Sequence, residues 1–165
     1  MKSLTCSTKQ ALFWITNILQ KHRIPFQIAG GLAARAYGST RPLIDIDIDI
    51  PEADFKKIHK EVQPYITYGP SKFINENWDL MLMTLCYKGQ DIDISGAHDA
   101  KLRDCVTSPW TKIDTDFSSV KSLIIEDMTL PVIDYQALIA YKRLCKRPVD
   151  LQDIHELESL KEKLS

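Results

Sequence analysis

Residues 30–50 read GGLAARAYGSTRPLIDIDIDI, and this stretch decides how the rest of the chain is interpreted. Its last part alternates Asp45, Asp47 and Asp49 with the four isoleucines from Ile44 to Ile50. Because successive side chains of a strand point to opposite faces, a strand here places the isoleucines in the core and the carboxylates on the other face. Carboxylates that are neighbours on one face lie about 6.6 Å apart along a strand. They repel one another, and an oxygen-binding divalent metal would relieve that repulsion. A solvated strand face without a metal is the plainer alternative.

The composition is that of an ordinary globular protein, with 165 residues of which 44% are apolar and 26% charged. We expect a single domain over residues 1–165, with a core at about residues 7–133 and closing helices at about residues 134–164. The net charge of -1 gives no general attraction to nucleic acid or to an anionic membrane. A polyanion would therefore have to bind a local patch of positive charge.

The cysteines and the apolar runs indicate the compartment. Cys6, Cys86, Cys105 and Cys145 are scattered, without a paired spacing or a histidine at metal-binding distance in the sequence. Free thiols are therefore expected, rather than a zinc site or a disulfide framework. The sequence shows no secretory signal and no apolar run of about 18 residues, so we expect a cytoplasmic protein without membrane contact.

The periodicity of the apolar residues predicts an α/β (α+β) fold, in which a mixed sheet is flanked by helices and followed by two C-terminal helices. Helices are predicted over residues 7–22 with Ser7 as the N-cap, 32–37, 52–62, 135–146 and 149–164. Strands are predicted over residues 26–29, 45–50, 65–68, 80–87, 92–94, 120–125 and 130–133. The last two pairs of strands form hairpins, residues 69–77 read as a loop, and residues 99–119 show no clear pattern.

The diglycine and the alternating carboxylates together predict phosphate chemistry. Glycines at a turn from strand to helix let the backbone approach a phosphate closely, and the N–H groups of a helix N-terminus favour negative charge. Two divalent ions about 3.5 to 4 Å apart stabilise the attacking and leaving oxygens of phosphoryl or nucleotidyl transfer, and carboxylates hold such ions. Gly30 and Gly31 are therefore candidates for binding phosphates, and Asp45 and Asp47 for binding metal.

A third carboxylate is expected from a second stretch of sequence. Residues 90–95, QDIDIS, repeat the alternation and place Asp91 and Asp93 on one face of a strand. A two-metal site commonly takes a ligand from another strand. Asp93 is the preferred candidate because isoleucines flank it, whereas Asp91 lies beside the predicted turn. The alternative for Asp93 is a solvated acidic residue.

These features resemble the DNA polymerase β-type nucleotidyltransferase superfamily. The matching pattern is the diglycine, then Arg41 ahead of Asp45-Ile46-Asp47, then a later carboxylate in an apolar strand. Residues 40–47, TRPLIDID, are similar to the Thr-Arg-x-x-x-Asp-Ile-Asp stretch of aminoglycoside 2''-nucleotidyltransferases. The position of Arg41 favours Asp45 with Asp47 as the metal pair, and Asp47 with Asp49 stays open as the alternative.

A second resemblance lies near the C-terminus. Residues 137–157, ALIAYKRLCKRPVDLQDIHEL, resemble the closing motif of bacterial nucleotidyltransferase-like proteins, including toxins of the abortive-infection type. In that motif a helix lysine precedes an Arg/Lys-x-x-Asp-x-x-Asp stretch. The resemblance implies that Lys142 reaches the triphosphate and that Asp150 and Asp153 lie near the nucleotide. From the residues alone, Lys142 could be an exposed helix lysine and Asp150 a helix N-cap.

The resemblance implies a transfer of NMP from an NTP to an acceptor hydroxyl with release of pyrophosphate, dependent on Mg²⁺ or Mn²⁺. Asp93 would ligate the metal that activates the hydroxyl and could accept its proton. The residues expected to act are, for catalysis and metal binding, Asp45, Asp47 and Asp93, and, for nucleotide binding, Gly30, Gly31, Arg41, Lys142, Asp150 and Asp153.

The acceptor cannot be read from the sequence. A small molecule, an RNA end and a protein side chain are all compatible with it, and a second subunit could complete the acceptor cleft as a homodimer. Three other functions stay open as alternatives. The chain could be a catalytically silent module that binds a nucleotide or a partner, the toxin half of a toxin–antitoxin pair, or a structural domain stabilised by metal.

Overall fold

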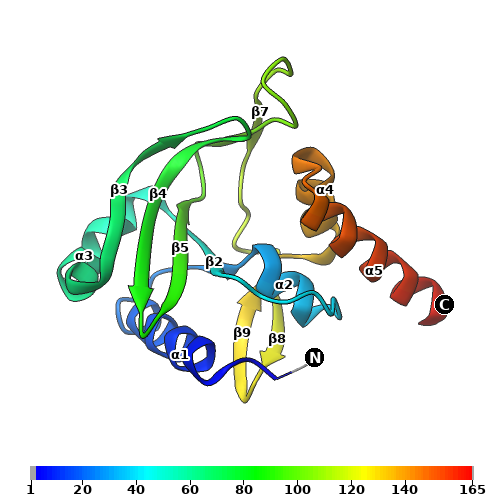
Figure 1. The fold of residues 1–165 in the computed structure, drawn as a ribbon. Helices are drawn as coiled ribbons and strands as arrows, with labels where there is room; N and C mark the ends of the chain where they lie inside the picture. The colour runs from blue at the N-terminus through cyan, green and yellow to red at the C-terminus, as the bar shows by residue number, and fades with distance from the viewer. Residues whose placement is uncertain (1–2, 165) are drawn as a thin grey trace.

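The computed structural model describes residues 3–164, and over this range a mixed sheet with flanking helices forms as predicted (Figure 1). Residues 1, 2 and 165 of the expected domain lie outside the described residues. The strands are β1 (Gln27–Ile28), β2 (Ile46–Ile50), β3 (Ile66–Ile74), β4 (Trp78–Tyr87), β5 (Gln90–Gly96), β6 (Ala100–Leu102), β7 (Thr111–Ile113), β8 (Lys121–Ile125) and β9 (Met128–Val132). Their order is β7-β6-β4-β5-β2-β1-β9-β8, and β3 pairs with β4. The pairs β2–β5 and β1–β9 are parallel and the others antiparallel.

Five helices flank this sheet within residues 3–164. They are α1 (Cys6–Lys21), α2 (Gly30–Ala36), α3 (Phe55–Val62), α4 (Tyr135–Cys145) and α5 (Pro148–Leu164), with single 3₁₀ turns at Glu52–Asp54 and Gln63–Tyr65. Helix α1 contacts β5, whereas α4 and α5 pack against each other and against α2. Figure 1 shows α4 and α5 side by side, away from β3, β4 and α3. None of the helices within residues 3–164 has the length and apolar character needed to cross a membrane.

The alternation in β2 has the predicted consequence for the core. Ile46, Ile48 and Ile50 are fully buried, as are Ile92 and Ile94 of β5, and they belong to the main hydrophobic cluster with residues of α1 and α3. The expectation is wrong for Ile44, whose side chain is 73% exposed, because the strand begins only at Ile46. Strand β2 therefore has one apolar face and one carboxylate face.

The largest correction concerns residues 69–77, which were expected to form a loop after a short strand. Strand β3 instead continues to Ile74 and pairs along β4, with register shifts around Gly69 and Pro70. Gly69 has φ +71°, and a Cβ at this position would lie 2.1 Å from the carbonyl oxygen of Leu82. Gly69 thus permits an irregular bend, after which the strand continues. The unassigned segment 99–119 contains the short strands β6 and β7.

Smaller corrections concern the ends of elements. Helix α2 begins at Gly30 rather than near residue 32, so the diglycine forms its first turn. The β8–β9 hairpin turns over residues 126–127, a tighter connection than the predicted four residues, because Met128 and Thr129 already pair with β8. Helix α1 is capped by Thr5 rather than by Ser7, since the Thr5 Oγ1 accepts a hydrogen bond from the Thr8 N–H at 3.2 Å.

The assignment of Thr5 as the N-cap predicts that loss of its hydroxyl destabilises the protein more than loss of the Ser7 hydroxyl. Thr5→Ala is expected to lower the free energy of unfolding by about 1 kcal/mol, because an orphan N–H group of the helix loses its acceptor. Ser7→Ala, the matched control, is expected to change it by less than about 0.5 kcal/mol. Urea denaturation followed by circular dichroism measures both changes, and a larger loss in the Ser7 variant would contradict the assignment.

Candidate active site

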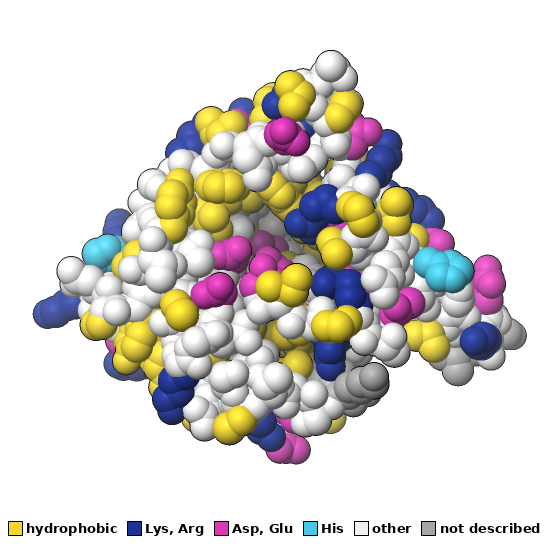
Figure 2. All heavy atoms as spheres, in the orientation of Figure 1, with side chains coloured by type: hydrophobic (Ala, Val, Ile, Leu, Met, Phe, Trp, Pro, Cys, Tyr) yellow, Lys and Arg dark blue, Asp and Glu magenta, His cyan; other side chains and the backbone are white. Residues whose placement is uncertain are grey.

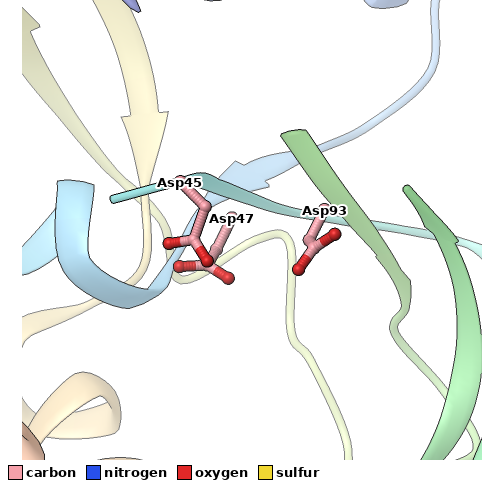
Figure 3. Close-up of side chains that lie close together, drawn as sticks. All are labelled: Asp45, Asp47 and Asp93. Atoms are coloured by element: carbon pink, nitrogen blue, oxygen red, sulfur yellow. The ribbon is translucent and has the colours of Figure 1, made fainter. Parts of the chain in front are cut away.

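Three carboxylates converge on the polar face of β2 and β5. Asp45 immediately precedes β2, Asp47 lies within it, and the parallel pairing of the strands sets Asp47 opposite Asp93 of β5. One carboxylate oxygen from each of the three residues lies within 4.8 Å of the others, and Figure 3 shows the side chains turned toward a common space. No other group of three or more His, Cys, Asp or Glu side chains within residues 3–164 could hold a metal ion.

The neighbouring acidic residues lie outside this group. Asp49 is on the same face of β2, but its Oδ2 accepts a hydrogen bond from the Gln27 Nε2 at 2.8 Å. Asp91 is exposed next to the β4–β5 turn. The geometry therefore groups Asp45 and Asp47 with Asp93, rather than Asp47 with Asp49.

The diglycine packs directly against Asp47. Gly30 has φ +54°, and a Cβ there would lie 1.8 Å from the Asp47 Oδ2, so only glycine fits without displacing the carboxylate. The N–H of Gly31 donates a hydrogen bond to the same oxygen at 3.3 Å. A Cβ on Gly31 would lie 2.8 Å from the Nη2 of Arg41, which brings this guanidinium to the same turn. The structure thus places the start of α2 beside the carboxylates.

Opposite the carboxylates, three cationic side chains alternate with two buried aspartates. The Lys142 Nζ lies 2.9 Å from the Asp153 Oδ2 and 3.2 Å from the Asp150 Oδ1. Arg41 donates to both oxygens of Asp153, from Nε at 3.2 Å and from Nη2 at 3.1 Å. Arg147 donates to both oxygens of Asp150, from Nε at 2.7 Å and from Nη2 at 3.1 Å. We call these five residues the ionic network.

The ionic network has a cleft side and a buried side. Arg41, Lys142 and Arg147 line the cleft described below, whereas Asp150 and Asp153 are completely buried behind them. Lys142 is not an exposed helix lysine, the alternative that the residues alone left open, because its side chain is 1% exposed. Asp150 and Asp153 are thus ionic partners of the cations that line the cleft.

A cleft of ≈ 400 Å³ brings these groups together between the carboxylate face of the sheet and α4. Figure 2 shows the hollow, with carboxylate side chains on its floor and cationic side chains along one rim. Its remaining wall is mainly apolar. The apolar and aromatic lining residues are Ala29, Ile44, Phe73, Trp78, Leu80, Leu82, Ala100, Leu102, Ile113, Ile133, Ala137, Tyr141 and Val149.

Neither a protein-family model nor a curated protein sequence matches the chain. Among solved structures, it is similar to TM1012, a candidate nucleotidyltransferase of Thermotoga maritima, with a TM-score of 0.66 and 17% identity over 99% of this chain and 96% of that one. The chain has the nucleotidyltransferase fold. The lincosamide antibiotic adenylyltransferase LnuA, in its lincomycin-bound form, gives a TM-score of 0.60 at 16% identity, covering 96% of this chain and 99% of that one. The antibiotic-resistance factor ANT(2'')-Ia gives 0.62 at 17% identity, covering 96% and 86%.

Within this nucleotidyltransferase fold, the three carboxylates repel one another. Burial raises the pKa of Asp47 to about 7, helped by the charges of Asp45 and Asp93 and opposed by the Gly31 N–H. Burial also raises the pKa of Asp93, although the hydroxyl of Thr84 donates to its Oδ1 at 2.7 Å and opposes the shift. Carboxylate oxygens are the ligands that Mg²⁺ and Mn²⁺ prefer, so the donor set fits a divalent ion.

The ionic network has the opposite effect on the carboxylate of Asp153. Burial alone would raise the pKa of Asp153, but hydrogen bonds from Arg41, Lys142 and Ser39 outweigh it and lower that pKa. Removing one partner of such a buried pair leaves an uncompensated charge, which typically costs about 3 to 5 kcal/mol. The cations along the cleft are therefore firmly held.

Two site residues were missed from the sequence. Arg147 is the arginine of the Arg-x-x-Asp-x-x-Asp stretch at residues 147–153, so the motif contained a signal for it. Thr84, which holds Asp93, lies in an unremarkable apolar strand. Its role follows only from the antiparallel register that pairs it with Asp93, and no local pattern could have revealed it.

The clash at Gly30 predicts a specific loss of metal binding. Gly30→Ala and Gly89→Ala both place a side chain at positive φ, which costs about 1 to 2 kcal/mol in each variant. Only at Gly30 would the new Cβ displace Asp47, because nothing lies within 4 Å of a Cβ at Gly89. Calorimetric titration with Mn²⁺ is expected to show weakened binding in the Gly30 variant alone. Equal Mn²⁺ binding in the two variants would show that metal binding does not depend on the close packing of Gly30 against Asp47.

The raised pKa of Asp47 predicts how the stability of the metal-free protein depends on pH. Folding raises the pKa of Asp47 to about 7, so the folded state binds more protons than the unfolded state between about pH 4 and pH 7. This contribution to stability is present at low pH and lost as pH rises through the folded pKa. Relative to Asp47→Asn, the wild-type protein in EDTA should lose on the order of 2 kcal/mol between about pH 5 and about pH 8.

Thermal unfolding of both proteins across this pH range measures the effect. Excess Mn²⁺ should restore the stability of the wild-type protein at the higher pH and leave Asp47→Asn nearly unchanged. A wild-type stability that tracks the variant at every pH would show that folding does not raise the pKa of Asp47.

Proposed function

We propose that the protein is a metal-dependent nucleotidyltransferase that moves NMP from an NTP to an acceptor hydroxyl and releases pyrophosphate. The convergence of Asp45, Asp47 and Asp93 opposite a row of cations is the observation that carries this proposal. The shared fold supports it, since LnuA is an adenylyltransferase and ANT(2'')-Ia has been crystallised with adenylyl-2''-tobramycin. Asp45, Asp47 and Asp93 would hold Mg²⁺ or Mn²⁺, and such ions stabilise the attacking and leaving oxygens of the transfer.

The acceptor side of the reaction involves Asp93. Its Oδ1 is held by the Thr84 hydroxyl at 2.7 Å, which fixes the carboxylate on the cleft face of β5. Asp93 would accept the proton of the acceptor hydroxyl while the oxygen of that hydroxyl bonds to the α-phosphorus. The bond between the α-phosphorus and the bridging oxygen breaks, and pyrophosphate leaves with that oxygen. A positioned general base typically contributes about 10²- to 10⁴-fold to the rate.

The leaving group would be received at the opposite wall. Gly30 and Gly31 at the start of α2 would bind the β- and γ-phosphates, with Arg41 and Lys142 nearby. The three cations of the ionic network outnumber its two carboxylates, so this wall keeps a net positive charge. That charge suits the departing pyrophosphate. Asp150 and Asp153 would act through the cations that they hold.

Single carboxylate variants test the proposal. Asp45→Asn, Asp47→Asn and Asp93→Asn are each expected to lower pyrophosphate release by at least about a hundredfold, because a metal ligand or the general base is lost. Asp91→Asn is the matched control, since it removes one exposed acid from the same strand as Asp93. The assay incubates each α-labelled NTP with Mg²⁺ or Mn²⁺ and with pools of small molecules, RNA and protein.

Three outcomes would distinguish the alternatives. Loss of turnover in the three variants, with Asp91→Asn unaffected, supports transfer at this site. Turnover that survives in Asp47→Asn and Asp93→Asn contradicts it. Nucleotide binding without pyrophosphate release, in the presence of every acceptor pool, would indicate a silent nucleotide-binding module.

A further inference from the structure

The cleft carries a large excess of uncompensated negative charge. The three cations that line it share the two aspartates of the ionic network, which leaves a single surplus positive charge. Within residues 3–164, by contrast, the lining carboxylates Asp45, Asp47, Asp49, Asp93 and Asp116 have no salt-bridge partner. Two divalent ions and a fully ionised triphosphate would cancel one another's charge. The loaded cleft would therefore remain negative, and this negative charge favours a cationic acceptor.

An apolar wall begins at Leu82 of β4, beside the catalytic carboxylates. Strand pairing forms a row of Asp47, Asp93 and Thr84 across β2, β5 and β4. The next row on the same face is Asp49, Ser95 and Leu82. From Leu82 the lining continues with Leu80 and with Phe73, which pair across β4 and β3. Leu102 of β6 and Ile113 of β7 extend it. An acceptor whose hydroxyl reaches Asp93 would therefore lay the rest of its body on apolar side chains.

An acidic loop borders this wall. The N–H of Thr115 donates to the carbonyl of Ala97 at 3.1 Å, and the N–H of Ala97 donates to the carbonyl of Ile50 at 2.9 Å, so the loop is tied to the ends of β5 and β2. Asp114 and Asp116 both line the cleft. Asp114 already pairs with Lys112 at 3.0 Å. Asp116 is held only locally, by the N–H and hydroxyl of Ser118, and its charge is available to a ligand.

We propose that the acceptor is a small molecule with one amine and an apolar body. Its hydroxyl would lie at Asp93, its apolar part on Leu80, Leu82 and Phe73, and its ammonium group beside Asp116. This inference rests on the proposed function. The volume of ≈ 400 Å³ suits a small molecule together with part of a nucleotide. An RNA end would bring its phosphates against the unpaired carboxylates, which disfavours that acceptor.

Three polyhydroxylated compounds separate the contributions of charge and apolar surface. N-octyl-glucamine carries both an amine and an alkyl chain, octanoyl-N-methylglucamide carries the chain without the charge, and N-methyl-glucamine carries the amine without the chain. We expect label transfer from an α-labelled NTP to N-octyl-glucamine, below its micellar concentration, with the highest kcat/KM. The advantage should be about threefold or more over the neutral compound and about tenfold or more over the short one.

Variants assign each contribution to its side chain. Asp116→Asn should remove the advantage of the amine, and Phe73→Ala should reduce that of the alkyl chain. Asp127→Asn is the matched control, because it removes one exposed acid from the β8–β9 turn, outside the cleft lining. Equal transfer to the charged and neutral compounds would overturn the inference, as would preferential labelling of an RNA oligonucleotide with a free 3'-hydroxyl or of tobramycin, a polyamine without an apolar body.

Two further readouts keep this inference distinct from the proposed function. Pyrophosphate release to water reports transfer chemistry without an acceptor, so its presence alongside a lack of acceptor preference overturns the inference alone. If no pyrophosphate forms under any condition, calorimetric binding of the three compounds still tests the subsite. Tighter binding of N-octyl-glucamine, lost in Asp116→Asn, would support the subsite, and equal binding of the charged and neutral compounds would overturn it.

Discussion

The parallel pairing of β2 with β5 is the constraint on which the site depends. It sets Asp47 directly opposite Asp93 and forces like charges together on one face of the sheet. The other face of both strands consists of fully buried isoleucines. A slip of one residue would turn those isoleucines toward the cleft and the carboxylates into the core, so the hydrophobic core fixes the register. The packing of an apolar face thus creates the electrostatic repulsion that a divalent ion would relieve.

The ionic network connects the two C-terminal helices to the loop that precedes β2 of that sheet. Asp153 of α5 binds Arg41, which precedes β2, and Lys142 of α4, so the loop before the carboxylates is held against the C-terminal helices. Glu156 of α5 adds contacts to the backbone and hydroxyl of Thr40 in the same loop. Because the three buried members of the network lose their hydration, each depends on its partners for compensation. This arrangement sets the cationic wall of the cleft opposite the carboxylates.

Local patterns revealed the carboxylates and the diglycine, and the C-terminal motif indicated Lys142, Asp150 and Asp153. Long-range pairing determined how these residues contact one another. The alternation around Asp47 and Asp93 was sufficient to predict two strands with acidic faces. The extension of β3 was missed because Gly69 and Pro70 normally end a strand, and here the length of β4 overrides that signal. The burial of Lys142 could not be predicted, since it depends on packing between α4, α5 and the loop that precedes β2.

Anomalous diffraction from crystals grown with Mn²⁺ and a non-hydrolysable NTP analogue is the most direct test of the central claim, that carboxylates from two strands share divalent ions. We predict anomalous peaks within coordination distance of Asp45, Asp47 and Asp93, with the triphosphate extending toward the start of α2. Peaks only at other carboxylates, or a nucleotide bound with no metal between it and Asp47, would contradict that claim.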